Sequence, residues 1–485
     1  LAIILRKRGT AVNRVRVMAI NRTEYISTRG NADALDFAGV TLTGLASDGG
    51  LYVPRHWPQF STEEITAMRG LSYVDLAARV MAPFTAGVLD EAELKGLCAT
   101  AYGSFAHQAV APLVQLDGQH WLLELFHGPT LALKDDALQL LGQFFERFLS
   151  GTDKKLTIVG ATSGDTGSAA IDAVAGRAQI EIFMLHPHNR VSDVQRRQMT
   201  TILAPNVHNI AIGGSFDDAQ AMVKRMFNDK DVNGPLTLSA VNSINWARLM
   251  AQVVYYFYAA LRLGGPERKV AFSVPTGNFG DVFAGYVAAQ MGLPIERLIV
   301  ATNINDILHR ALAKGDYSVL GVTPTATPSM DIQVSSNFER LLFDLEGRDG
   351  STTGARMKWF EQMGKMILSP EMRKKASLLT SARTDAEQMS AAMRWAYGAT
   401  DQIIDPHTAI ALHAARTAGI RSDVPVVTLA SAHPAKFPDA VEEATGVRPA
   451  LPARVSQLFD REERFDVLPG TYDAVRDYVL ARATR

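Results

Sequence analysis

LTIVGATSGDTGSAA, residues 156–170, is the stretch that decides the fold. Its first four residues are an apolar run typical of a buried strand, and its end opens a helix-length segment. Glycines permit the tight turn between them, and free amides at a helix N-terminus attract anions. The spacing of Gly160, Gly164 and Gly167 does not match the dinucleotide fingerprint, and no Gly-Lys-Ser/Thr follows. The stretch therefore predicts a strand–turn–helix unit, which is either an ordinary turn or a site for a small ligand.

The same pattern recurs along the chain. Further apolar, strand-like runs occupy residues 180–185, 269–274, 298–301 and 424–429. Helix-length segments lie between them, and the apolar segment 246–263 is expected to be a buried helix. Short buried strands that alternate with helices predict an α/β fold with an open, mostly parallel sheet covered by helices on both faces.

The composition argues against several classes of protein. The chain has 485 residues, of which 47% are hydrophobic and 20% charged, which is typical of a globular protein. This length exceeds what one hydrophobic core usually serves, so we expect two or three structural units. The formal net charge of −1 gives no electrostatic footprint for nucleic acid or a membrane surface. No stretch approaches the run of about 20 apolar residues that a membrane span needs.

Cysteine and histidine usage predicts neither a disulfide nor a metal site. Cys98 is the only cysteine, so an internal disulfide and a thiolate zinc site are excluded, and we expect it to be a small buried apolar residue. His186 and His188 flank a proline without a third ligand nearby, so we expect no metal. A cytoplasmic location fits these features.

The first 17 residues are expected to be an extension without function. Residues 1–22 are rich in arginine and lysine and contain no acid before Glu24, which is also compatible with a transit peptide. Because the segment is short and no secretory cleavage pattern follows, we expect the working chain to start near Met18.

A second segment, FHGPTLALKD at residues 126–135, places a lysine in apolar surroundings. A Gly-Pro turn precedes a helix that starts close to Lys134. Desolvation disfavours an ammonium ion and lowers its pKa, which is how a lysine becomes a nucleophile that can form a Schiff base. The alternative is a lysine whose amine reaches solvent.

Three more segments combine turn residues with polar side chains. They are PTGNFGD at 275–281, NSINWAR at 242–248 and SAHPAKF at 431–437. Glycines around Asn278 and Phe279 let several backbone N–H groups converge, which suits a phosphate. Asn245 and Arg248 share a helix face, and Arg248 offers a forked donor to an anion. Ser243 is alternatively the helix N-cap.

Together these segments resemble the threonine synthase family of fold-type-II pyridoxal-phosphate (PLP) enzymes. The resemblance also includes YISTRG at 25–30, GLASDGGLYVP at 44–54, ATNIND at 301–306, PSMDIQVSSNFER at 328–340 and DPHT at 405–408. It extends from about residue 18 to 439 and is closest to the branch with a long N-terminal unit. It implies a fold like that of the tryptophan synthase β subunit, with PLP as cofactor.

The resemblance also implies a division into units. Residues 18–110 would form an N-terminal domain, residues 111–152 and 241–485 the large PLP domain, and residues 153–240 a smaller inserted α/β domain. The oligomeric state, monomer or homodimer, does not follow from the sequence.

Carried over residue by residue, the family pattern implies these roles. Lys134 stands at the place of the Schiff-base lysine and is the expected catalytic residue. The loop Gly277, Asn278, Phe279 and Gly280 matches the cradle for the cofactor phosphate. Asp165, with Ser163 beside it, falls where related enzymes contact the ring hydroxyl, and Ser431 falls near the pyridine nitrogen, where threonine is usual. The region that holds the substrate phosphate is matched by Thr166, Ser243, Asn245 and Arg248.

The implied activity is the last step of threonine biosynthesis, in which O-phosphohomoserine and water give L-threonine and phosphate. The expected partner is this small-molecule substrate, and neither nucleic acid nor a membrane. Other fold-type-II activities remain as alternatives: a phospho-lyase acting on O-phosphohomoserine, or a serine or threonine dehydratase, whose substrate has no phosphate. A PLP-binding protein without turnover is a further alternative.

Overall fold

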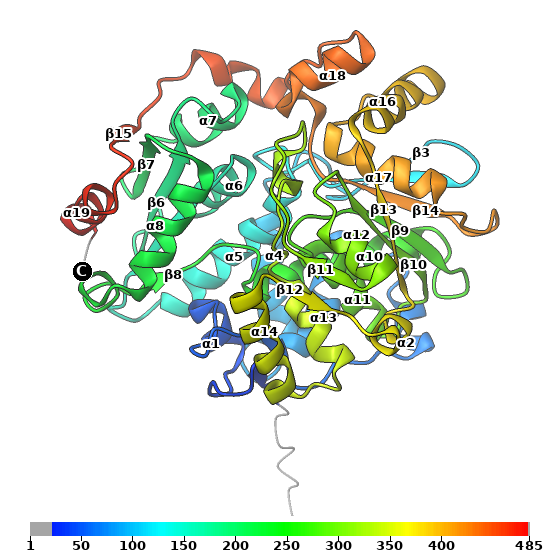
Figure 1. Ribbon diagram of the computed structural model, residues 1–485, viewed down its shortest axis with the longest axis horizontal. Helices are drawn as coiled ribbons and strands as arrows, with labels where there is room; N and C mark the ends of the chain where they lie inside the picture. The colour runs from blue at the N-terminus through cyan, green and yellow to red at the C-terminus, as the bar shows by residue number, and fades with distance from the viewer. Residues whose placement is uncertain (1–21, 484–485) are drawn as a thin grey trace, which may run out of the picture.

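The computed structural model describes residues 22–483, and two parallel or mostly parallel β-sheets with helices on their faces organise it (Figure 1). The expected α/β architecture is therefore confirmed. No helix in the described range is both long and apolar enough to cross a membrane. The expectations for residues 1–17, an extension or a transit peptide, lie outside the described residues.

The larger sheet has six strands in the order β13-β10-β9-β14-β4-β3. Its strands are β3 Leu113–Gln115, β4 His120–Glu124, β9 Val270–Pro275, β10 Ile295–Thr302, β13 Leu379–Arg383 and β14 Val426–Ala430. All neighbours pair in parallel except β3, which runs antiparallel to β4.

Helices pack on the larger sheet and on one another beside it. They are α5 Lys134–Leu149, α10 Trp246–Arg262, α11 Gly280–Gln290, α12 Ile307–Lys314, α16 Ala386–Thr400 and α17 Pro406–Thr417. Helix α17 packs on β9, β10 and β14, whereas α10 packs against α11 and α5. Every residue of α10 from Trp246 to Leu261 is buried, as the apolar segment predicted.

The smaller sheet has five parallel strands in the order β15-β7-β6-β5-β8. Its strands are β5 Leu156–Ala161, β6 Ile180–Pro187, β7 Val207–Ile212, β8 Leu238–Ser239 and β15 Asp466–Leu468, and its helices are α6 Asp165–Val174, α7 Asp193–Thr200, α8 Phe216–Asn228, α9 Lys230–Asn233 and α19 Tyr472–Arg482. Figure 1 shows the C-terminal strand and helix beside β7 and α8.

The path of the C-terminus bears on the division into domains. The sequence placed all of residues 241–485 in the large domain, but β15 pairs with β7 and α19 packs against α8. Hydrophobic side chains of α19, including Val475 and Val479, are buried in the core of the smaller sheet. We therefore propose that residues 466–482 belong to the smaller unit.

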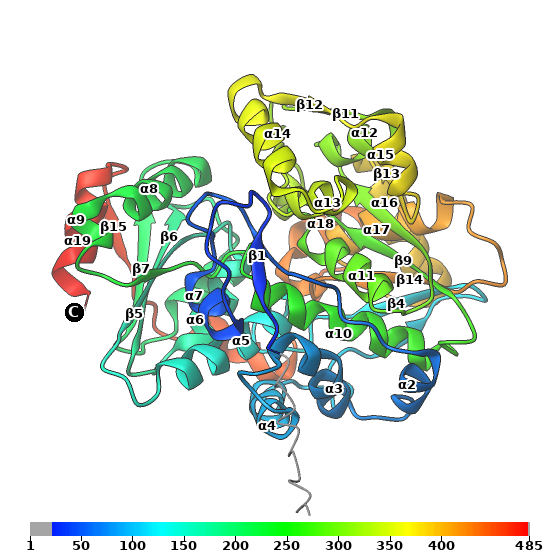
Figure 2. The same cartoon turned by 90° about the horizontal axis from the view of Figure 1, so that it is seen from below.

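The N-terminal part packs against the helices of the larger sheet. It contains the antiparallel strands β1 Tyr25–Ser27 and β2 Tyr52–Pro54 and the helices α1 Phe37–Thr43, α2 Thr62–Ala67, α3 Tyr73–Thr85 and α4 Glu91–Tyr102. Helix α3 contacts α10, and α4 contacts α5 (Figure 2). Cys98 of α4 is free and buried, and burial raises the pKa of its thiol to about 12.

The remaining elements lie outside the two sheets, and η2 and η3 contact α7 of the smaller unit. They are the antiparallel pair β11 Asp316–Ser318 and β12 Lys365–Ile367, the helices α13 Phe338–Leu345, α14 Gly350–Met363, α15 Pro370–Lys375 and α18 Pro438–Thr445, and the 3-10 helices η1 Pro328–Met330, η2 Pro434–Lys436 and η3 Ala453–Asp460.

Candidate active site

Lys134 is held in place by the end of a β-strand. It is the first residue of α5, and the segment before it pairs with the chain that leaves β14. The amide of Leu133 donates to the carbonyl oxygen of Ser431 at 2.8 Å, and the amide of His433 donates to Leu131 at 3.0 Å. These backbone bonds fix the lysine and Ser431 side by side at the carboxyl end of the larger sheet, where open α/β sheets bind ligands.

The surroundings of Lys134 lower the pKa of its ammonium group. Burial is the largest cause, and the positive charge of Arg248 adds to it, whereas the carboxylates of Asp165 and Asp281 act in the opposite direction. The desolvation expected from the sequence is thus present, and it favours the neutral, nucleophilic amine.

A small cavity opens beside Lys134. Six of the residues singled out from the sequence line it: Lys134, Asp165, Gly277, Asn278, Phe279 and Ser431. The others do not line it: Ser163, Thr166, Ser243, Asn245, Arg248 and Gly280. The structure therefore joins loops from both sheets around one lysine.

The loop after β9 has the backbone geometry of an anion cradle. Phe279 has a left-handed backbone with φ of 67°, and the side chain of Asn278 accepts a hydrogen bond from Gly280 N at 2.9 Å. A Cβ atom on Gly277 would lie 2.5 Å from the carbonyl oxygen of Ser329, so only glycine fits there. The loop leads directly into α11, whose N-terminal amides attract anions.

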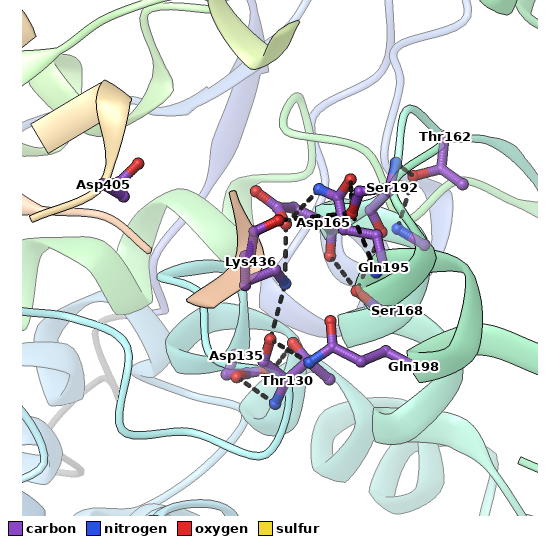
Figure 3. Close-up of polar contacts among 12 residues, drawn as sticks. Thr130, Asp135, Thr162, Asp165, Ser168, Ser192, Gln195, Gln198, Asp405 and Lys436 are labelled. Carbon is purple, nitrogen blue, oxygen red and sulfur yellow. Dashed lines mark hydrogen bonds and ion pairs between the residues drawn. The ribbon is translucent and has the colours of Figure 1, made fainter. Parts of the chain in front are cut away.

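Asp165 is engaged in a buried ion pair. Lys436 Nζ lies 2.8 Å from Asp165 Oδ1, and the same oxygen accepts a hydrogen bond from Gln195 Nε2 at 2.9 Å (Figure 3). Burial alone raises the pKa of Asp165, but the charge and hydrogen bond of Lys436, followed by Gln195, outweigh it and lower that pKa to about 2. The carboxylate is therefore ionised, and one of its oxygens is already occupied by two donors.

Lys436 also connects the two sheets. Its ammonium donates to the carbonyl oxygen of Thr130 at 2.7 Å, and Gln198 of α7 donates to the same oxygen at 2.9 Å. Thr130 in turn donates from its amide and hydroxyl to Asp135, directly after Lys134. Lys436 is 0% exposed, and sequence reasoning did not assign it a role, although it lies in the segment SAHPAKF.

The start of α10 differs from the expectation. Asn245, not Ser243, is the N-cap: its Oδ1 accepts from Ala247 N at 3.0 Å, while its Nδ2 donates to Thr41 O at 2.9 Å. Asn245 rather than Ser243 caps the helix because its side chain reaches the backbone amide of the second helical residue. Ser243 instead contacts Asn337, whose side chain also donates to Asn278 O.

Arg248 is buried close to Lys134. It is 3% exposed, its Nη1 donates to Val241 O at 2.6 Å, and its Nε has no partner among residues 22–483. Burial lowers the pKa of its guanidinium to about 10. An uncompensated buried cation of this kind favours an anion as ligand.

Two ionisable residues in the cavity wall, Asp281 and His407, were not assigned roles from the sequence. Asp281 accepts hydrogen bonds from the hydroxyl groups of Tyr255 and Tyr256, and burial raises its pKa. His407 is the second residue of α17, and its Nδ1 lies 2.8 Å from Asp405 Oδ2. The sequence feature that could have pointed to His407 is the segment DPHT at residues 405–408, in which Asp405 caps the helix.

Comparison with known families decides the relationship. The model described as threonine synthase N terminus matches residues 24–102, that of pyridoxal-phosphate dependent enzymes residues 105–432, and that of the threonine synthase C-terminal part residues 408–479. The chain belongs to the threonine synthase family. It is therefore a PLP-dependent enzyme of the lyase class, and the resemblance found in the sequence is confirmed.

Individual relatives agree over nearly the whole length. The threonine synthase of Pseudomonas aeruginosa is 55% identical over 463 residues, which cover 95% of this chain and 99% of that protein. The PLP-bound threonine synthase of Brucella melitensis superposes with a TM-score of 0.93 at 51% identity, covering 96% of this chain and 100% of the other. The yeast enzyme gives 0.89 at 38% identity, with coverages of 95% and 98%.

The residues of the cavity fit the PLP cofactor. They supply an amine with a lowered pKa, a glycine-bounded loop at a helix N-terminus, and a hydroxyl at Ser431. His407 Nε2 and Asp281 Oδ2 are buried in the cavity wall without a partner among the described residues, and such orphaned polar atoms call for a ligand.

Proposed function

We propose that this enzyme converts O-phosphohomoserine and water to L-threonine and phosphate. The observation that carries the proposal is the placement of a buried, incompletely paired arginine, Arg248, near a lysine of lowered pKa. O-phosphohomoserine carries a phosphate in addition to its carboxylate, so it needs one more anion site than an unphosphorylated amino acid does, and Arg248 offers such a site. This argument favours O-phosphohomoserine over the substrate of a dehydratase.

The cofactor-binding residues in this proposal are those expected from the sequence. Lys134 holds the cofactor covalently, and the backbone N–H groups of Gly277, Asn278, Phe279 and Gly280 bind its phosphate. Ser431 contacts the pyridine nitrogen, and Asp165, with Ser163 on the same turn, lies beside the ring hydroxyl. Bound PLP supplies an electron sink for the carbon chemistry.

Lys134 is the proposed base. Because burial and the charge of Arg248 disfavour its ammonium form, the free amine takes a proton from Cα of the substrate readily. The same amine then takes a proton from Cβ, which allows the γ-phosphate to leave. Cγ gains a proton before water adds at Cβ. Asp165 and Asp281 limit the depression of its pKa, so the amine can also hold the proton that it has removed.

The substrate phosphate is assigned to Arg248, Ser243 and Thr166. Arg248 stabilises the charge that develops on the leaving phosphate through its forked N–H groups. Asn245 contributes indirectly in this proposal, since both of its side-chain groups already hold the first turn of α10. That turn carries Arg248.

Product analysis tests the proposal. The purified enzyme with PLP is incubated with O-phosphohomoserine, and phosphate, threonine, 2-oxobutanoate and ammonia are measured. Equal amounts of threonine and phosphate support the proposal. Phosphate with 2-oxobutanoate and ammonia but no threonine would instead indicate a phospho-lyase. Absence of phosphate release would point to a dehydratase or to a PLP-binding protein without turnover.

The substrate is the only partner that we propose. The formal net charge of −1 offers no basis for a nucleic-acid or membrane partner. A cytoplasmic location is part of the same proposal, and cell fractionation with an antibody against the chain tests it.

A further inference from the structure

The wall of the cavity contains a histidine that the assignments above leave unused. His407 is 4% exposed and lies at the start of α17, which packs on β9 and β14. It shares the cavity with Lys134 and Ser431. Its Nε2 is buried and has no hydrogen-bond partner among residues 22–483. Leaving such an atom unpaired is unfavourable, so a ligand that pairs it gains affinity.

Asp405 fixes which nitrogen of His407 is free. This carboxylate is 0% exposed and accepts hydrogen bonds from His407 N at 2.9 Å and from Thr408 N at 3.0 Å. His407 Nδ1 lies 2.8 Å from the same carboxylate. Because a carboxylate oxygen only accepts, Nδ1 carries a proton and Nε2 of the neutral ring is an acceptor.

A free acceptor in this cavity needs a donor on the ligand. The phosphate of PLP accepts hydrogen bonds, and its pyridine nitrogen is assigned to Ser431, so the ring hydroxyl is the donor that remains on the cofactor. Asp165 was assigned beside this hydroxyl, but its Oδ1 already receives hydrogen bonds from Lys436 and Gln195. Asp165 and His407 both line this small cavity, so both groups are available to the same ligand.

We propose that His407, oriented by Asp405, is a cofactor-binding residue whose Nε2 accepts a hydrogen bond from the ring hydroxyl of PLP. This inference rests on the proposed assignment of the cavity. His407 would thus hold the ring opposite its phosphate and help set the protonation state of the hydroxyl, while Asp165, tied to Lys436, supplies negative charge beside it.

Two substitutions of His407 distinguish the contribution of Nδ1 from that of Nε2. In His407→Asn the amide lies where Nδ1 lay and keeps a donor for Asp405, but nothing replaces Nε2. In His407→Gln the amide oxygen reaches the place of Nε2, but the bond to Asp405 is lost. The matched pair therefore distinguishes ligand binding from a purely structural role in the cap of α17.

Cofactor-free wild type and both variants are titrated with PLP, and the Kd, the absorbance spectrum of the bound cofactor and the unfolding midpoint are measured. We expect His407→Asn to raise the Kd about fivefold, as for one lost hydrogen bond, and to alter the spectrum without lowering the midpoint. His407→Gln should bind PLP more tightly than His407→Asn and be less stable. A wild-type Kd and spectrum in His407→Asn, or a change only in the KM for substrate, would overturn the inference. Failure of the wild type to bind PLP would instead refute the site itself.

Discussion

Replacement of Lys436 by methionine is the most informative test of the contact between the two sheets. The substitution keeps the length of the side chain and removes the charge, so Asp165 stays buried at 7% exposure with Gln195 as its remaining side-chain donor. In the wild type the pKa of Asp165 falls from 3.8 to about 2, although burial alone raises it. A shift of this size corresponds to about 2.5 kcal/mol in favour of the ionised form.

The loss of stability should exceed that value. Removing one partner of a buried ion pair leaves an uncompensated charge and costs about 3–5 kcal/mol. Lys436 also donates to Thr130 O, and this hydrogen bond is lost as well. We therefore expect the free energy of unfolding of the cofactor-free protein near neutral pH to fall by about 3–5 kcal/mol.

The pH dependence gives the prediction a second signature. In the wild type the folded pKa of Asp165 is depressed, so its contribution to stability is present above pH 3.8 and is lost as the pH falls through about 2. Without Lys436, burial raises the folded pKa above the unfolded value, and stability should instead decrease as the pH rises from about 4. The difference between variant and wild type is thus largest at neutral pH.

Denaturant unfolding, followed by circular dichroism at several pH values, measures these effects. Lys374→Met, on an exposed residue of α15, is the control and should stay within about 0.5 kcal/mol of wild type. Adding Asp165→Asn to Lys436→Met removes the unpaired charge and should recover most of the loss. The reasoning fails if Lys436→Met costs less than about 1 kcal/mol, or if its cost is the same at acid and neutral pH.

Three further predictions concern the site. Gly277→Ala should weaken PLP binding at least tenfold, because the new Cβ atom would lie 2.5 Å from Ser329 O. Gly398→Ala is the control, since a Cβ atom there would meet nothing within 4 Å. Equal Kd values for the two variants would contradict the role of the Gly277–Gly280 loop in binding the cofactor phosphate. Arg248→Met should raise the KM for O-phosphohomoserine at least tenfold and leave the Kd for PLP unchanged. Arg262→Met, on the same helix, is the control. An unchanged KM would show that Arg248 does not bind the substrate phosphate. Asp135→Asn should flatten the stability profile between about pH 4 and 7. Burial raises the pKa of this carboxyl to about 7, so in that window folding takes up a proton and wild-type stability falls as the pH rises; an unchanged profile would show that Asp135 is ionised in the fold.

Local sequence patterns predicted five of the parallel strands, β5, β6, β9, β10 and β14, and the loops that follow them. The cavity does join Lys134, Asp165, Ser431 and the turn after β9, because carboxyl ends of parallel strands meet at one edge of a sheet. Motif spacing could locate these residues, since the turn, the glycine and the helix start are all encoded within a few positions.

Such local patterns could not predict contacts between residues that are far apart in the sequence. Nothing near Lys436 in the sequence shows that Asp165, 271 positions away, neutralises it. The free Nε2 of His407 likewise depends on how α17 packs on the larger sheet. The return of β15 to β7 was missed because a strand of three residues carries almost no periodicity. The choice of Asn245 over Ser243 as N-cap was missed because both types cap helices well.

The central claim is that phosphate leaves by elimination and that water then adds to carbon. The direct test is turnover of O-phosphohomoserine in water enriched in oxygen-18, with wild type and with Lys134→Ala, followed by mass spectrometry of both products. The account predicts the label in the hydroxyl group of threonine, none in the phosphate at early times, and no product from the variant. Label in the phosphate together with unlabelled homoserine would mean that the enzyme hydrolyses the ester at phosphorus, which would contradict the account.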